Sequence, residues 1–293
     1  MFIIKYKKIF VSISIVLVLS AIGAISFFGL NFGIDFKGGA LTEVQYVNSR
    51  PEVSTLEAQL ESLSLGQALI QPIGEKSYSI KTRDVTDAEH KQILSALGQD
   101  AVETSFTSVG PSVGVELARK SLITFILVSL GIIFWIAFSF RKVSKPVSSW
   151  RYGFIAIVSL VHDVVISAGV FAVLGYLTGA EVDTLFVVAI LTVLGLSVSD
   201  TIVVFDRIRE NIRIGHFKTF EETVGRSINQ VFSRSIATSS TVIIVLLALV
   251  FFGPESTKVF AIMLTAGMFF GTYSSIFLAS PLLVLVENWQ KKN

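Results

Sequence analysis

The sequence contains no cysteine and only three histidines among its 293 residues. The lack of cysteine excludes disulfides, thiolate nucleophiles and cysteine-based zinc sites, and it leaves the redox compartment open. Charge is also scarce, because Asp, Glu, Lys and Arg make up 16% of the residues, against about 25% in typical soluble domains. The net charge of +2 is too small to indicate a nucleic-acid partner. Because nucleotide fingerprints, metal-ligand clusters and nucleophile–base pairs are also missing, we expect a non-enzymatic protein without cofactor or metal.

Hydrophobic residues, by contrast, make up 52% of the chain, and the mean hydropathy is +0.71. They gather in runs long enough to cross a hydrocarbon core of about 30 Å at 1.5 Å per residue. The first run is longer than the apolar part of a signal peptide, so we favour an uncleaved signal anchor over a cleaved leader. We therefore predict six transmembrane helices, over residues 9–30, 122–140, 154–178, 185–205, 236–252 and 259–286, and Pro281 is expected to kink the last.

Residues 35–120 are polar and contain no spanning run, so they form a separate domain between the first two spans. Alternation and helical spacing of apolar residues predict strand, helix, strand, strand, helix, strand, the order of a ferredoxin-like α+β domain. The expected organisation is a terminus and span at 1–34, the α+β domain at 35–120, and five spans at 121–293. A charged segment at 206–235 is expected to form an interfacial helix and a loop.

Basic residues are distributed unevenly between the loops. Outside the domain at 35–120, one set of loops holds almost all of the basic residues: Lys5, Lys7, Lys8, Arg141, Lys142, Lys145, Arg151, Arg207, Arg209, Arg213, Lys218, Arg226, Arg234, Lys291 and Lys292. Because cytoplasmic loops are the basic ones, both termini are expected in the cytoplasm and residues 35–120 outside it.

Acidic residues inside the apolar runs are the main functional signal. A carboxylate at the bilayer centre costs about 2.5–3.5 kcal/mol on insertion scales, so such groups usually serve ion or proton paths or pair with another charge. Asp200 lies near the cytoplasmic end of its run, where Ser197, Ser199 and Thr201 can supply hydroxyl ligands. Burial would favour its protonated form and a nearby arginine its ionised form. A purely structural hydrogen bond to a neighbouring helix is the alternative.

Three further residues are candidates for the same chemistry. Arg234, at the entrance of the next run, is the candidate partner of Asp200; otherwise it is an ordinary basic anchor at the membrane surface. Asp163 lies deeper in its run, and its alternative role is helix packing through a polar pair. The adjacent His162 can relay protons, although a lone histidine is more often a packing residue.

Several motifs resemble the SecF members of the SecD/SecF family. The segment GIDFKGG at 33–39 is similar to the family motif after the first span. The segment SDTIVVFDRIREN at 199–211 closely matches the long family signature, and NQVFSRSIATS at 229–239, VGPSVG at 109–114 and the His162–Asp163 pair also match. The motifs occur in the family's order over almost the whole chain.

The resemblance implies a partner and a function. SecF pairs with SecD, a related six-span chain similar to RND transporters, and associates with the SecYEG channel, YajC and the translocating preprotein in the inner membrane. The pair uses a proton or sodium gradient to promote late steps of export. Asp200 and Arg234 fall on the family's cation-linked residues, whereas Asp163 and the motif residues Asp35, Gly38 and Gly39 have less defined roles, the glycines being conformational.

Two other classes remain as alternatives. The same buried carboxylate would serve an RND-like exporter of small molecules or lipids, which would need a hydrophobic cleft in the outer domain. A non-transporting membrane scaffold or sensor would tolerate neutral substitution of every intramembrane charge.

Overall fold

A computed structural model describes residues 2–63, 66, 68–139, 148–215 and 217–292, without the side chains of residues 137, 149, 255 and 292. The chain divides into a helical unit, Met1–Asn31 with Thr124–Asn293, and a smaller unit, Phe32–Ile123. Residues 67, 140 and 216, and the basic residues Arg141, Lys142 and Lys145 of the orientation argument, lie outside the described residues.

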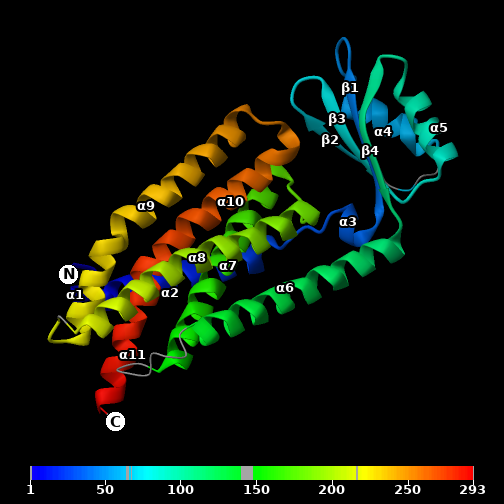
Figure 1. Cartoon of the computed structure of the whole chain (residues 1–293). Helices are drawn as coiled ribbons and strands as arrows, with labels where there is room; N and C mark the ends of the chain where they lie inside the picture. Colours follow the sequence, from blue (N-terminus) through cyan, green and yellow to red (C-terminus); the bar gives the residue numbers. More distant parts are fainter. Residues whose placement is uncertain (1, 64–65, 67, 140–147, 216, 293) are drawn as a thin grey trace. The chain divides into compact units, whose positions relative to one another are not determined.

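The smaller unit contains a four-stranded antiparallel sheet in the order β2-β3-β1-β4 (Figure 1). Its elements follow the predicted order after one short helix, α3. They are listed here with their bounds: α3 (Ile34–Lys37), β1 (Gly39–Tyr46), α4 (Val53–Glu61), β2 (Leu69–Ile73), β3 (Ser77–Thr82), α5 (Asp87–Leu97) and β4 (Ala101–Val109).

The core of this unit lies on one face of the sheet. Val44 and Tyr46 of β1 alternate with more exposed neighbours, as residues two apart in a strand point to the same face. Tyr78 and Ile80 of β3 belong to the same core, which they form with three buried leucines and one buried isoleucine of α4 and α5. The period-2 pattern of the strands and the helical pattern of α4 and α5 therefore serve a single apolar layer.

The two glycines of the GIDFKGG motif adopt conformations that other residues avoid. Gly38 has φ +79° and Gly39 has φ +132°. A methyl group on Gly38 would lie 2.7 Å from Cα of Pro111, and one on Gly114 would lie 3.0 Å from the Gly38 nitrogen. The GIDFKGG and VGPSVG motifs thus meet, and glycine is required because their backbones pack against each other. Asp35 lies half-buried in α3 beside this contact.

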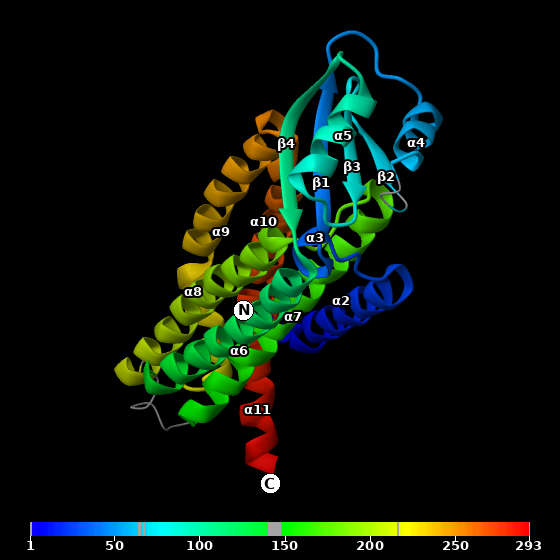
Figure 2. The same ribbon diagram turned by 90° about the vertical axis from the view of Figure 1, so that its right-hand side faces the viewer.

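The described part of the chain has six helices that are long and apolar enough to span a membrane. The helices carry these bounds: α1 (Phe2–Lys5), α2 (Lys7–Phe28), α6 (Pro111–Ser139), α7 (Ser149–Thr178), α8 (Thr184–Ile214), α9 (Phe220–Phe252), α10 (Glu255–Ser274), the π-helical η1 (Ser275–Ala279) and α11 (Ser280–Lys292). Helix α10 packs against α7, α8 and α9, and α2 packs along α7 (Figures 1 and 2).

The expectation of a separate interfacial helix at 206–235 was wrong. Helix α8 continues to Ile214 and α9 begins at Phe220, so both helices extend beyond the apolar stretches of their spans. Gly215 ends α8 with φ +73°, and the Thr219 hydroxyl caps α9 by accepting from the Glu222 backbone nitrogen at 3.1 Å. The charged residues here lie on these helix extensions.

The last span changes its helical geometry before Pro281. Because proline has no backbone N–H, it cannot donate to the preceding turn of the helix. The chain forms the π-helical segment η1 just before it, and the Ser280 hydroxyl donates to the Ser275 carbonyl at 3.1 Å. A π-helical segment of this kind is frequent at functional sites.

The glycine contact predicts a difference between two matched substitutions. Gly38 and Gly98 share nearly the same conformation, with φ, ψ of 79°, 163° and 91°, 168°, but a methyl group on Gly98 would meet no atom within 4 Å. Backbone strain alone costs about 1–3 kcal/mol. We expect Gly98→Ala to lose about that much stability and Gly38→Ala clearly more, measured by thermal unfolding of the full chain in detergent. Equal melting temperatures would show that the approach of Pro111 is not tight.

Candidate functional site

Asp163 lies within α7 and is completely buried. Its Oδ2 accepts a hydrogen bond from the Ser274 hydroxyl of α10 at 2.8 Å and another from the Ser197 hydroxyl of α8. Its Oδ1 lies 2.8 Å from Nδ1 of the neighbouring His162. Side chains from three helices therefore satisfy this carboxyl group, as a buried polar group requires.

Asp200 lies on α8, part-buried, and is held in a similar way. The Ser235 hydroxyl of α9 donates to its Oδ1 at 2.6 Å, and the Ser275 hydroxyl of η1 donates to its Oδ2 at 2.8 Å. Asp200 thus joins α8 to the helices on both sides of it. Its side chain lies among neighbouring helices rather than in open solvent.

The two carboxyl groups belong to one polar network. Ser274 and Ser275 are consecutive residues that donate to Asp163 and Asp200 respectively. Ser197 and Asp200 are three residues apart on α8 and therefore share a helix face. The network crosses α7, α8, α9 and the α10–η1 junction within helices that are otherwise mostly apolar.

Ser274 and Ser275 each have a second acceptor within reach. The Ser274 hydroxyl lies 3.0 Å from the Gly271 carbonyl oxygen, and the Ser275 hydroxyl lies 3.0 Å from the Thr272 carbonyl oxygen. A hydroxyl has one hydrogen to donate and two lone pairs to accept with. Each serine can therefore donate to its carboxylate, or donate to its own helix and accept from a protonated carboxyl.

Glycines of α10 allow this helix to approach α8 closely. A methyl group on Gly267 would lie 2.1 Å from Cγ2 of Val193, and one on Gly271 would lie 3.0 Å from Cβ of Ser197. The GxxxG spacing of these residues is typical of close helix contacts in membranes. The contact at Gly271 sets the position of Ser197, which donates to Asp163.

The residues predicted around Asp200 do not all reach it. Ser199 is exposed, and the Thr201 hydroxyl donates to the Ser197 carbonyl of its own helix at 3.2 Å. Only Ser197 of that group binds a carboxylate, and the carboxylate is Asp163. Spacing along α8 could not predict this, because a hydroxyl near a carboxylate in sequence often points to a different helix.

The predicted pairing of Asp200 with Arg234 is not formed within the described residues, where serines bind Asp200 instead. Arg234 is exposed on α9, and within the described residues no ion pair involves it. Its neighbour Ser235 instead turns inward to Asp200. Adjacent residues of a helix point about 100° apart, so only one of the two can face α8.

The long motif on α8 forms a polar ladder with α9. Asn211 donates to the Ser227 hydroxyl at 2.8 Å and to Gln230 Oε1 at 2.7 Å, and Arg207 Nε donates to the same Gln230 oxygen at 2.7 Å. With Asp200 and Ser235 further along, these contacts fix the antiparallel register of the two helices. Three polar residues of this motif, Asp200, Arg207 and Asn211, therefore bind the neighbouring helix.

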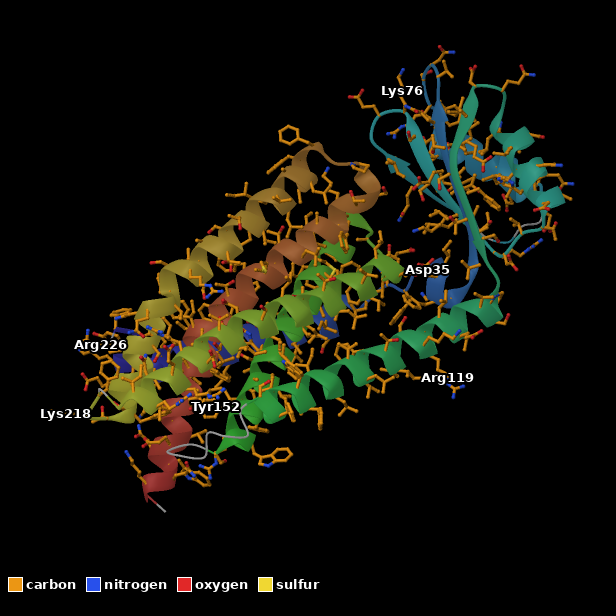
Figure 3. All side chains as sticks on the ribbon, in the orientation of Figure 1. Asp35, Lys76, Arg119, Tyr152, Lys218 and Arg226 are labelled. Atoms are coloured by element: carbon orange, nitrogen blue, oxygen red, sulfur yellow. The ribbon has the colours of Figure 1, made fainter. Side chains whose placement is uncertain are left out.

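Basic side chains gather at the end of the helical unit where α8 turns into α9. Lys218 and Arg226 lie there (Figure 3). Lys7 forms an ion pair with Glu221, whose Oε1 also accepts from Asn288 at 2.8 Å, so segments near both chain ends meet the start of α9. The Lys7 ammonium lowers the pKa of the Glu221 carboxyl below its usual value, and the Asn288 amide adds to this effect.

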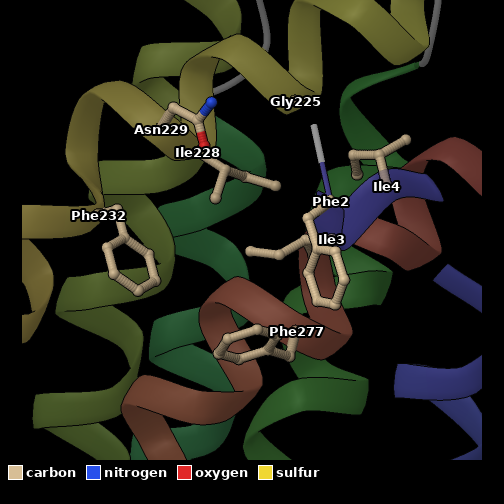
Figure 4. Close-up of a pocket in the computed structure, with 8 residues that line it drawn as sticks. All are labelled: Phe2, Ile3, Ile4, Gly225, Ile228, Asn229, Phe232 and Phe277. Carbon is tan, nitrogen blue, oxygen red and sulfur yellow. The ribbon is translucent and has the colours of Figure 1, made fainter. Parts of the chain in front are cut away.

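An apolar pocket of about 320 Å³ lies at this end of the helical unit. Figure 4 shows α1, α9 and η1 contributing its lining residues: Phe2, Ile3, Ile4, Gly225, Ile228, Asn229, Phe232 and Phe277. The pocket contains none of the carboxylates described above. Among the described residues, no three His, Asp or Glu side chains gather as a metal site.

Comparisons with known proteins agree with this arrangement. The model of the C-terminal region of SecD/SecF protein-export membrane proteins matches residues 89–289, and the model of the SecD/SecF GG motif matches residues 23–49. The chain belongs to the SecD/SecF family and groups with its SecF subunits. It is similar to protein translocase subunits SecF of Thermobaculum terrenum, at 41% identity over 98% of this chain and 94% of that protein, and of Anaerolinea thermophila, at 35% over 98% and 94%.

Solved SecDF structures show the same fold. The crystal structure of SecDF from Thermus thermophilus, a translocon-associated membrane protein, matches 97% of this chain with a TM-score of 0.83 at 33% identity. A SecDF structure in a super-membrane-facing form matches 99% with a TM-score of 0.70 at 31% identity. This chain spans 38% and 39% of those SecDF chains. It is thus a multi-pass membrane subunit of a protein translocase whose partner is SecD.

Three residues of the network did not stand out in the sequence. Ser235, Ser274 and Ser275 lie in or beside apolar runs in which serine is common, and serine in a membrane helix usually bonds to its own backbone. A usable signal was the position of Ser274 and Ser275, seven and six residues before Pro281, because helices are often irregular near proline.

The network predicts that a single hydroxyl contributes measurably to folding. Ser274→Ala removes one donor from the fully buried Asp163, and the loss of a partner to a buried polar group costs about 1–3 kcal/mol. We expect a lower melting temperature of the full chain in detergent. Ser12→Ala, at an exposed serine of α2, serves as the control and should leave the melting temperature unchanged. Equal values for both variants would show that Ser274 contributes no stability.

Proposed function

We propose that this chain, together with SecD, uses a proton or sodium gradient to promote late steps of preprotein movement through the SecYEG channel. The proposal depends mainly on one observation: consecutive serines at a π-helical junction hold the carboxyl groups of Asp163 and Asp200. Membership in the translocase family favours protein export over export of small molecules or lipids. YajC and the preprotein itself are proposed as further partners.

Cation binding at Asp200 would reorganise the hydrogen bonds at the α10–η1 junction. As a carboxylate, Asp200 accepts from both Ser235 and Ser275. Once protonated it becomes a donor as well, so one of the hydroxyls has to accept from it and donate elsewhere. Ser275 has the Thr272 carbonyl available at 3.0 Å for this purpose. The same exchange is open to Ser274 beside Asp163.

The energy available from such a step is modest. One elementary charge crossing a membrane potential of 100 mV releases about 2.3 kcal/mol. This is enough to shift a helix junction between two hydrogen-bond arrangements and to bias a loosely held polypeptide outward. It is too little to unfold a stable domain, which typically takes about 5–15 kcal/mol.

Arg234 is proposed to face SecD. It forms an exposed polar stripe on α9 with Thr238 and Thr241, which follow at helical spacing. An arginine exposed to lipid is costly, so such residues are normally paired. The part of SecDF that this chain does not cover can supply the acidic partner, and movement at Asp200 would reach Arg234 through the adjacent Ser235.

We further propose the setting in which the chain works. Both termini would lie in the cytoplasm and residues 35–120 outside the inner membrane, supported by the basic end of the helical unit. The outer unit is proposed to have the ferredoxin-like fold, supported by its sheet order and antiparallel pairing. Domain limits at 35 and 120 are supported by the compact unit Phe32–Ile123.

The central test replaces Asp200 by asparagine in a reconstituted export system with SecD and the SecY channel. We expect Asp200→Asn to reduce export to the level measured without a gradient, because the amide cannot exchange a proton, while ATP-dependent export persists. Asp206→Asn is the matched control, since Asp206 is exposed on the same helix. Gradient-dependent export at wild-type level from Asp200→Asn would remove this residue from the mechanism.

A second test concerns the partner surface. We expect Arg234→Gln to lower the amount of SecD that co-purifies in mild detergent, because an interfacial charge pair is lost. Arg226→Gln is the control, at an exposed arginine of α9 outside its apolar stretch. If both variants retain SecD equally, Arg234 does not face the partner.

A further inference from the structure

Helices α2 and α7 run parallel in a regular register. The rings of Phe28 and Tyr176 lie 4.7 Å apart, and a methyl group on Gly169 would lie 2.6 Å from Cβ of Ala21. Both contacts pair residues that are seven apart on each helix. A seven-residue repeat keeps two helices in contact along one seam. The next pair along this seam is Ser14 and His162.

Tyr273 supports this placement independently. Its hydroxyl donates to the Phe10 carbonyl at 3.3 Å, while its ring stacks on His162 with centroids 6.3 Å apart. Phe10 is one turn before Ser14 in α2, and its carbonyl is the acceptor of the Ser14 backbone nitrogen in a regular α-helix. Ser14 and His162 therefore lie at the same level of the bundle.

Both side chains are buried and each has a polar atom with no hydrogen-bond partner. Ser14 is 1% exposed and His162 is 3% exposed. Within the described residues, Ser14 Oγ and His162 Nε2 make no hydrogen bond, and neither does Oγ of the fully buried Ser159, one turn before His162 on α7. Leaving a buried polar atom unpaired is costly, so unpaired atoms at the same level of two neighbouring helices indicate a common partner.

We propose that one water molecule is bound between α2 and α7, bridging Ser14 Oγ and His162 Nε2, with Ser159 as a third contact. Nδ1–H of His162 then donates to Asp163, and Nε2 accepts a hydrogen from the water. A buried water typically makes about three hydrogen bonds, which matches the atoms available. The Asp163 network thereby extends through the imidazole to the first span.

The site gives His162 a position in a proton path. Water, imidazole and carboxyl group form a continuous hydrogen-bonded chain in which a proton taken up at Nε2 is matched by one released from Nδ1 to Asp163. The imidazole is neutral before and after this transfer, but its hydrogen then lies on Nε2 instead of Nδ1. The ring has to return to the first tautomer before the next transfer. This role in coupling rests on the function proposed above, whereas the water site rests on the geometry alone.

The test is proton-detected solid-state NMR of the full chain in liposomes, labelled with ¹⁵N-histidine. The sequence has only three histidines, and the His162 signals are assigned by their disappearance in His162→Gln. We expect the Nδ1–H tautomer in the wild-type protein and a cross peak between water protons and the His162 ring. The measurement needs no gradient and no export, so failure of the coupling mechanism would not affect it.

Two substitutions distinguish the bridging water from other arrangements. We expect Ser14→Val, which replaces the hydroxyl by methyl groups, to abolish the cross peak, and Ser14→Ala to weaken it. Ser12→Val, at an exposed position of α2, should leave it intact. A wild-type spectrum without the water cross peak, as a direct Ser14–His162 hydrogen bond would give, overturns the proposal. So does a cross peak that persists unchanged in both Ser14 variants.

Discussion

The need to satisfy two carboxyl groups inside a helical bundle constrains the rest of this structure. Asp163 and Asp200 take hydroxyl donors from the helices around them, and these helices must come close enough to provide them. The glycines of α10 make that approach possible, since a side chain at Gly271 would displace Ser197. Burial, close helix packing and the polar network are therefore parts of one arrangement.

Local patterns in the sequence predicted most of the helices and strands. The predicted order of strands and helices within 35–120 is the order that the structure has after α3, and six spans follow from length and hydropathy. The helical extensions at 206–235 were missed because charge in a segment between two spans indicates a water-exposed position, which a straight helix reaches as readily as a loop. The polar residues there contact each other across the hairpin, as Asn211 and Ser227 do.

The candidate site was only partly predictable, for a related reason. An acidic residue in an apolar run is conspicuous, so Asp163 and Asp200 were found. Their partners are serines on other helices, and a single sequence carries no information on which helices become neighbours or how each is rotated. Arg234 illustrates this limit, because it is exposed although the adjacent Ser235 is buried against Asp200.

Ser274 and Ser275 have a consequence for stoichiometry. Because they follow each other on one stretch of backbone, a turn of that stretch moves both hydroxyls at once. If cations bind at Asp163 and Asp200 as proposed, the two sites are coupled, because a change in the hydrogen bonds at one serine also moves the serine that holds the other carboxyl group. A transport cycle built on this junction would count its cations per pair of sites.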